Sequence, residues 1–118
     1  MADWWQWSQQ KEEQALTFAV VGVGRFGTAV CRELISNGVD VLAADASEKA
    51  IDDLRQLEPS IEARVIDCTD EESMKESGIL EMNTVVVGIS EPIEASITTT
   101  LIAKDSEGTK VKRVIARA

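Results

Sequence analysis

The feature that most constrains this sequence is the glycine-rich stretch T-F-A-V-V-G-V-G-R-F-G-T at residues 17–28. It opens with a short apolar, β-branched run, Phe18–Val21, which is typical of a buried strand, and a helical pattern follows its last glycine. Between them, Gly22, Gly24 and Gly27 give the spacing G-x-G-x-x-G. The first glycine permits a sharp turn, the second lets a pyrophosphate approach the backbone, and the third lets the helix pack closely on the strand. This stretch predicts a strand–turn–helix unit that binds phosphate at the helix amino terminus.

An acidic residue follows this loop at a suitable distance. Asp45 ends the segment V-D-V-L-A-A-D, 18 residues after Gly27 (45 − 27). The spacing is close to the ~20 residues expected of a carboxylate that accepts hydrogen bonds from ribose hydroxyls. A carboxylate there repels a 2′-phosphate, so it favours NAD or an adenine nucleotide over NADP. The alternative is that Asp45 only caps the following helix; because strand, loop, helix and acid occur together, we favour ribose binding.

Composition excludes several other classes of protein. The 118 residues suffice for one domain with a real core, and the formal net charge of −9 argues against nucleic acid as a partner. No apolar run approaches the ~20 residues of a membrane span and no signal peptide is recognisable, so we expect a cytoplasmic location. In that compartment Cys31 and Cys68 are expected to be buried thiols rather than a disulfide.

The sequence contains no histidine and no tyrosine. These are the usual proton-transfer groups of nicotinamide dehydrogenases, and nothing else beside the glycine loop has an obvious catalytic role. We therefore expect a binding protein and not an enzyme. An NAD-dependent oxidoreductase, or a redox-sensing nucleotide-binding module, remains the alternative.

The rest of the chain predicts five strands that alternate with four helices. The predicted strands cover about 17–21, 40–44, 63–66, 84–88 and 111–116; the helices cover about 25–37, 48–57, 70–76 and 90–104. Thr69 and Glu72 have the spacing of a capping box, and Pro92 is placed in the first turn of the last helix. That helix has apolar positions at Ile93, Ala95, Ile97, Leu101 and Ile102. The fold class is α/β, a Rossmann-like doubly wound parallel sheet with strand order 3-2-1-4-5.

In this topology a ligand crevice lies at the carboxyl ends of the first and fourth strands, where the winding reverses. The predicted contact residues are therefore the loops that follow the strands. They are Gly22, Val23, Gly24, Arg25, Phe26, Gly27, Asp45, Ala46, Asp67, Cys68, Thr69, Ile89, Ser90 and Glu91.

Residues 1–15 form a tryptophan-rich extension before the domain at 16–118. Trp4, Trp5 and Trp7 all lie there, outside any pattern of the domain. Two interpretations stay open. The extension docks on a partner, a neighbouring copy or a membrane surface, or its aromatic side chains cover an exposed patch.

The sequence resembles the RCK/KTN (TrkA-N) domain in five segments that occur in the same order. They are V-V-G-V-G-R-F-G-T, D-V-L-A-A-D, a D-x-T turn, T-V-V-V-G-I-S and V-I-A-R. The resemblance covers about residues 17–118. The helix sequence E-A-S-I-T-T-T-L-I-A-K is similar to the corresponding helix of the Ktr-type regulatory subunit. Two differences are visible. The third-strand turn reads I-D-C-T where the family more often has G-D-A-T, and the C-terminal regulatory domain of full subunits is absent from this stretch.

The resemblance implies regulation of potassium transport and not catalysis. It implies binding of ATP/ADP or NAD(H), assembly into dimers and an eight-domain ring, and a membrane potassium-translocating subunit as partner. The protein would then be cytoplasmic, held at the inner face of the cell membrane through that partner. Arg25 would meet a terminal phosphate and discriminate ATP from ADP; otherwise it is a surface arginine that offsets Glu33 or Asp70. We assign no metal site, although the family allows a cation between domains, with Glu91 and Glu94 as candidates.

Overall fold

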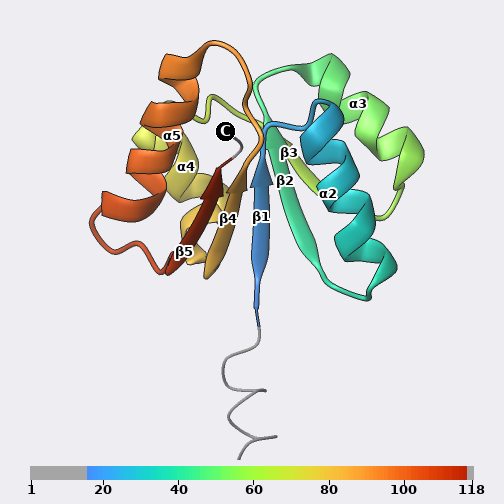
Figure 1. Ribbon diagram of the computed structural model, residues 1–118, viewed down its shortest axis with the longest axis horizontal. Coiled ribbons are helices and arrows are strands. Elements are labelled where there is room, and N and C mark those ends of the chain that lie inside the picture. The colour runs from blue at the N-terminus through green and yellow to red at the C-terminus, as the bar shows by residue number, and fades with distance from the viewer. Residues whose placement is uncertain (1–15, 117–118) are drawn as a thin grey trace, which may run out of the picture.

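The computed structural model describes residues 16–116, which form a five-stranded parallel sheet of order β3-β2-β1-β4-β5. The predicted fold class and strand order are confirmed. Figure 1 shows the strands side by side, with their carboxyl ends at one edge of the sheet. The elements, in chain order, are β1 (Phe18–Val21), α2 (Arg25–Ser36), β2 (Val41–Asp45), α3 (Glu48–Leu57), β3 (Glu62–Val65), α4 (Glu71–Ser77), the 3₁₀ turn η1 (Ile79–Glu81), β4 (Thr84–Val87), α5 (Ile93–Asp105) and β5 (Arg113–Ala116).

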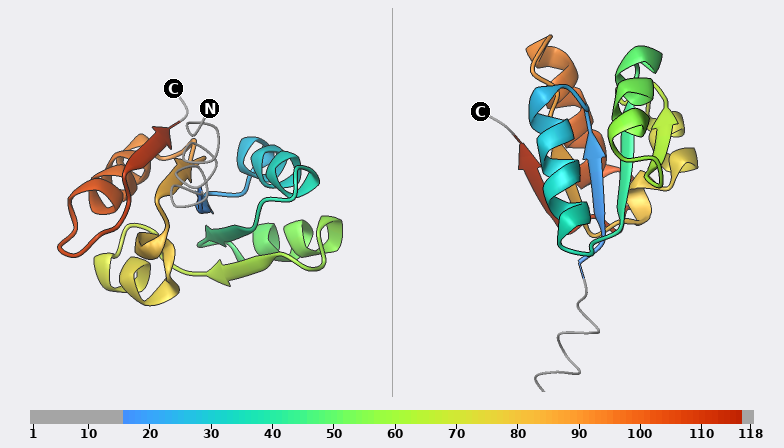
Figure 2. Two further views of the ribbon diagram at one scale, coloured as in Figure 1. Left: turned by 90° about the horizontal axis from the view of Figure 1, so that it is seen from below. Right: turned by 90° about the vertical axis from the view of Figure 1, so that its right-hand side faces the viewer.

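The central strand β1 pairs with β2 on one side and β4 on the other, so that Phe18 lies opposite both Val41 and Thr84. The sheet is covered on both faces: α2 and α3 lie on one, α4 and α5 on the other (Figure 2). Because side chains alternate along a strand, β1 contributes to two cores. Val20 packs in the core under α2 and α3, while Ala19 and Val21 pack in the core under α4 and α5.

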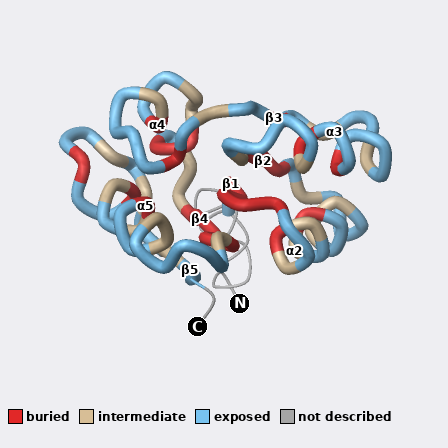
Figure 3. The backbone as a smooth tube through the Cα atoms, turned by 90° about the horizontal axis from the view of Figure 1, so that it is seen from above, coloured by how far each residue is buried: buried red, intermediate tan, exposed pale blue. Residues whose placement is uncertain are grey.

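Burial is greatest in the centre of the sheet. All four residues of β4 are buried, as expected for a parallel strand covered on both faces, whereas β3 and β5 at the edges are mostly exposed (Figure 3). The helices leave some of their large apolar side chains exposed. In α3, Ile51 and Leu54 are buried, but Leu57 is 49% exposed.

Three of the five predicted apolar positions of α5 face away from the core, although Ile102 packs against it. Thr99 and Ala103 are buried, whereas Ile93, Ile97 and Leu101 are 67%, 53% and 54% exposed. The helix also begins at Ile93, one residue after Pro92, because the backbone of Pro92 is still extended (ψ 156°). The predicted first-turn position of Pro92 is therefore wrong.

Candidate functional site

The glycine turn between β1 and α2 is built around one carbonyl group. Gly22 has φ +91°, a conformation that favours glycine, and its N–H donates to the Ala44 carbonyl (2.8 Å). A Cβ on Gly27 would lie 1.8 Å from the Gly22 carbonyl oxygen, and one on Gly88 would lie 2.7 Å from the same oxygen. Three glycines thus allow β1, α2 and β4 to meet at one point.

Gly24 has a different environment. A Cβ there would have no heavy atom within 4 Å, so packing does not explain this glycine. Gly24 is the N-cap of α2, no side chain caps that helix end, and its first turn has no acidic residue. The positive end of the helix dipole therefore has no charge of this helix to offset it, which suits an anion.

The carboxylate of Asp45 ties the glycine turn to the end of β2. The N–H of Val23 donates to Asp45 Oδ2 (2.8 Å), and the N–H of Ser47 donates to Asp45 Oδ1 (2.8 Å). The side chain that caps α3 is Ser47, which accepts from the Ala50 N–H (3.1 Å). Asp45 therefore holds two loops in place and does not simply cap the helix.

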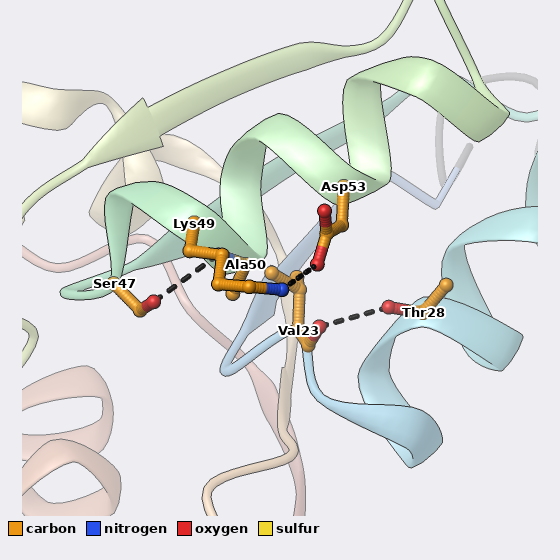
Figure 4. Close-up of polar contacts among 6 residues, drawn as sticks. All are labelled: Val23, Thr28, Ser47, Lys49, Ala50 and Asp53. Atoms are coloured by element: carbon orange, nitrogen blue, oxygen red, sulfur yellow. Dashed lines mark hydrogen bonds and ion pairs between the residues drawn. The ribbon is translucent and has the colours of Figure 1, made fainter.

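Figure 4 shows Val23 and Thr28 at the glycine turn beside Ser47, Lys49, Ala50 and Asp53 at the start of α3. The hydroxyl of Thr28 donates to the Val23 carbonyl (2.8 Å), which closes the turn from within α2. On the first turns of α3, Lys49 pairs with Asp53 (2.9 Å). Both oxygens of Asp45 and the carbonyl of Val23 are thus engaged with the protein itself.

The turn after β3 forms another wall. The N–H of Thr69 (2.9 Å) and its hydroxyl both donate to Asp67 Oδ1, and these hydrogen bonds lower the pKa of Asp67. The predicted capping box at Thr69 is wrong by one residue. Asp70 caps α4 by accepting from the N–H (3.0 Å) and the hydroxyl of Ser73 (2.7 Å). The backbone of Asp70 is still extended (ψ 119°), so the helix begins one residue later than a cap at Thr69 would require.

Cys68 belongs to this turn and contacts α5. Its carbonyl accepts a hydrogen bond from the buried hydroxyl of Thr99 (2.9 Å), which fixes α5 to the turn. Burial raises the pKa of the Cys68 thiol to about 12, and the charges of Asp45 and Asp67 act in the same direction. The thiol is therefore protonated at neutral pH and is a poor nucleophile.

A cavity of about 350 Å³ lies where these loops converge, at the carboxyl ends of β1 and β4. It brings together ten of the fourteen predicted residues: Gly22, Gly24, Asp45, Ala46, Asp67, Cys68, Thr69, Ile89, Ser90 and Glu91. Three further lining residues were missed: Gly88, Pro92 and Ala95. Gly88 ends the V-V-V-G run, which was a usable signal, whereas Ala95 enters only through the position of α5.

The other four predicted residues lie elsewhere around the loop. Val23 and Arg25 line a neighbouring cavity of about 500 Å³, between α2 and α3, in which Gly24 also takes part. Gly27 is buried beneath Gly22, and Phe26 packs against the core under α2 and α3. Among the described residues, no ion pair joins Arg25 to Glu33 or Asp70. Because Gly24 lines both cavities, a ligand that passes it from the first cavity approaches Arg25 in the second.

No helix within residues 16–116 is long and apolar enough to cross a membrane.

A parallel sheet of order 3-2-1-4-5, a glycine turn that opens a helix, and an acid at the end of the second strand define a Rossmann-type domain. Within that class the chain belongs to the TrkA-N domain family, which it matches over residues 18–118. This confirms the resemblance described from the sequence.

Three individual proteins are informative. The chain is 41% identical over 88 residues to the Ktr system potassium uptake protein C of Bacillus subtilis. The aligned segment covers 75% of this chain and 39% of that protein. It is 40% identical over 89 residues to the Ktr system potassium uptake protein A of Vibrio alginolyticus, covering 75% and 40%. The chain thus spans about two-fifths of the length of these relatives. A crystal structure of the NAD(P)-binding domain of an exopolyphosphatase-related protein from Archaeoglobus fulgidus superposes with a TM-score of 0.73 at 27% identity, over 87% of this chain and 73% of that one.

Proposed function

We propose that this chain is the nucleotide-binding domain of a regulatory subunit of a potassium transport system. The observation that carries the proposal is the cavity at the carboxyl ends of β1 and β4, where the glycine turn, Asp45 and the Asp67–Thr69 turn converge. The identity of about 40% to two Ktr system potassium uptake proteins supports potassium transport as the process served. In this account a nucleotide is bound and not consumed, and its binding shifts the balance between two conformations.

The cavity suits the parts of a nucleotide in a definite order. The phosphates lie at Gly24, where the amino terminus of α2 is uncapped and a Cβ would find open space. The ribose hydroxyls lie at Asp45, whose carboxylate has acceptor capacity left beside its two backbone donors. The adenine lies towards Cys68 and Thr69, on the wall formed by the β3–α4 turn.

ATP or ADP is the nucleotide that we favour, because its terminal phosphate can extend into the neighbouring cavity. A phosphate chain that passes Gly24 comes within reach of Arg25, and Arg32 lines the same cavity. A guanidinium forms strong, paired hydrogen bonds with phosphate oxygens, so an added γ-phosphate gains contacts that ADP lacks. NAD(H) remains the other candidate, and the Archaeoglobus domain described as NAD(P)-binding supports it.

A catalytic role has less support. The sequence offers no histidine or tyrosine, and the thiol that lines the cavity has its pKa raised to about 12 by burial and nearby carboxylates. Cys68 is therefore neither a thiolate nucleophile nor a base at neutral pH. A nicotinamide oxidoreductase or redox-sensing module remains the alternative function.

The exposed side of α5 supports self-association. Ile93, Ile97 and Leu101 recur at every fourth position and are each more than half exposed. An apolar stripe of this kind costs free energy in water and suits a symmetric contact with a second copy. The same helix reaches the cavity through Ala95, so a nucleotide there can bias how two copies pack. Dimers, and an octameric ring beneath a membrane potassium-translocating subunit at the inner face of the cell membrane, complete the proposal.

Calorimetric titration of ATP, ADP, NAD, NADH and NADPH into the protein tests this function. We expect ATP and ADP to bind and NADPH to bind least, because its 2′-phosphate would meet the Asp45 carboxylate. Asp45→Asn should weaken the binding of every nucleotide that has a free 2′-hydroxyl. Asp52→Asn, an exposed carboxylate on α3 outside the cavity, is the matched control and should change nothing.

The outcomes separate the candidates. Binding of NADH alone, with turnover of a carbonyl substrate, would favour the oxidoreductase alternative. Binding of no nucleotide would refute the proposed function, because the cavity would then have no role as a ligand site.

A further inference from the structure

Another cavity lies at the opposite edge of the sheet, at the amino ends of β1, β2 and β3. Its volume is about 580 Å³. Its apolar lining consists of Leu16, Phe18, Val39, Val41, Leu42 and Met82. The strand arrowheads in Figure 1 point away from this edge, so the cavity is remote from the glycine turn. The proposed nucleotide function makes no use of it.

The chemistry of the cavity suits an aromatic side chain that carries one polar group. Met82 offers a thioether, which packs favourably against aromatic rings. Arg64 also lines the cavity, and its guanidinium can stack on a ring face while it donates to Glu62 (3.1 Å). The carboxylates of Asp40 and Glu62 are acceptors for a ring N–H. An indole satisfies all three kinds of contact.

The position of Leu16 connects this cavity to the amino-terminal extension. Leu16 is the first described residue, lines the cavity and is 51% exposed. The three tryptophans lie upstream of it, and Trp7 is nine residues away (16 − 7). Nine residues span up to ~30 Å when extended, so an indole of this segment can return to a cavity whose rim includes Leu16. A tethered group also has an effective concentration in the millimolar range for a short flexible linker.

We propose that the Trp4–Trp7 segment docks on its own domain and places an indole in this cavity. The occupant is thus part of the same chain, and the docking removes from water both an indole and the apolar lining around Leu16. A separate protein or a lipid surface would have to compete with a group that is always present. The proposal is independent of nucleotide binding.

Intrinsic fluorescence tests the docking directly. All tryptophans of the sequence lie in residues 1–15 and there is no tyrosine, so the emission of the full chain reports this segment alone. We expect blue-shifted emission and several-fold weaker acrylamide quenching than in the urea-unfolded chain, independent of protein concentration. Val39→Lys should shift the emission to the red and raise quenching several-fold, because it places a charge in the cavity.

Val39 suits this test because, among the described residues, it belongs to neither core cluster, and its backbone bond to Leu34 does not depend on the side chain. Val65→Lys is the matched control: Val65 is 46% exposed on β3 and lies outside the cavity. It should leave emission and quenching unchanged. Arg64→Ala, at an exposed position, is a second variant if circular dichroism shows that Val39→Lys does not fold, and it should raise quenching.

Three results would overturn the proposal. The first is solvent-like emission from the wild-type chain. The second is a folded Val39→Lys or Arg64→Ala variant with wild-type emission and quenching. The third is a blue shift that develops only with rising protein concentration or only on addition of phospholipid vesicles, since a second copy or a lipid surface would then be the partner of the tryptophans.

Discussion

Two glycines of the same turn have opposite roles at the scale of single residues. Gly27 is needed by the fold, because a Cβ would lie 1.8 Å from the Gly22 carbonyl oxygen. Gly24 is not, because a Cβ there would find open space and its φ of −71° is allowed for any residue. A motif that reads as three equivalent glycines therefore combines structural and ligand-facing positions.

Gly27→Ala should destabilise the protein by ~3 kcal/mol or more, since the backbone must shift to relieve the overlap. Gly24→Ala should cost only ~1 kcal/mol, because the added Cβ meets open space and alanine is merely a poorer N-cap than glycine. It should nevertheless weaken nucleotide binding at least tenfold. Urea unfolding measured beside calorimetric titration checks both variants. An unstable Gly24→Ala, or one that binds as the wild type does, would contradict this division of roles.

The two buried thiols make the free energy of unfolding depend on pH in the alkaline range. Burial raises the pKa of Cys31 and of Cys68 to about 12, from an ordinary value of 9.0. Well below pH 9 the thiols are protonated in both states, so they have no effect on the pH dependence there. Between pH 9 and 12 the unfolded chain loses these protons while the folded chain keeps them, so the free energy of unfolding falls as pH rises.

The slope from each thiol is at most ~1.4 kcal/mol per pH unit. Urea unfolding between pH 8 and 10.5 measures this slope, and Cys31→Ala should make it shallower because one of the two thiols is gone. An equal slope in the variant would show that Cys31 ionises as readily in the folded state as in the unfolded state.

At the scale of elements, α5 connects the cavity with the exposed apolar stripe. Its buried Thr99 donates to the carbonyl of Cys68, and its first turns line the cavity. Thr99→Val keeps the shape of the side chain but leaves that carbonyl without its donor, which should cost ~1–2 kcal/mol. Nucleotide affinity should fall as well, because the β3–α4 turn loses its link to α5.

Thr100→Val is the control for this prediction. Its hydroxyl bonds within the helix, to the Ser96 carbonyl (2.8 Å), and not to the turn. It should leave affinity unchanged in calorimetric titration. Equal effects of the two substitutions on affinity would mean that α5 has no specific link to the site.

The elements also show where sequence reasoning succeeds and where it fails. The Phe18–Gly27 unit and the continuous apolar run of β4 were predictable because local pattern and burial agree. The predicted cap of α4 at Thr69 is wrong because spacing alone cannot show that the backbone is still extended at Asp70, which is the actual cap. In α5 the large side chains of Ile93, Ile97 and Leu101 lie outward while Thr99 is buried, and the sequence pattern did not reveal this.

At the scale of the whole molecule, the parallel topology places a different cavity at each end of the strands. The candidate nucleotide cavity lies at the carboxyl ends of the strands, and the cavity beside Leu16 lies at their amino ends. Ten of the predicted site residues come together because strand order alone determines which loops meet. Arg25 was placed with them, yet it lines the neighbouring cavity, since the direction of a side chain at the start of a helix is not fixed by topology.

The exposed stripe of α5 predicts association of copies. Ile97→Glu, in the middle of the stripe, should weaken self-association at least tenfold, equivalent to ~1.4 kcal/mol. The reason is that a buried, unpaired carboxylate is costly at a symmetric contact. Sedimentation measures the effect, with Thr98→Glu at an exposed position beside the stripe as control. Equal association by the two variants would place the contact elsewhere.

The central claim is that a nucleotide binds at the glycine turn and that Arg25 reads its terminal phosphate. The most direct test is the ratio of ATP to ADP affinity, measured by calorimetry for the wild-type chain and for Arg25→Ala, with Arg113→Ala on β5 as a remote control. We predict that Arg25→Ala weakens the binding of ATP several-fold more than the binding of ADP, while Arg113→Ala changes neither affinity. An unchanged ratio in Arg25→Ala would contradict this account of phosphate recognition.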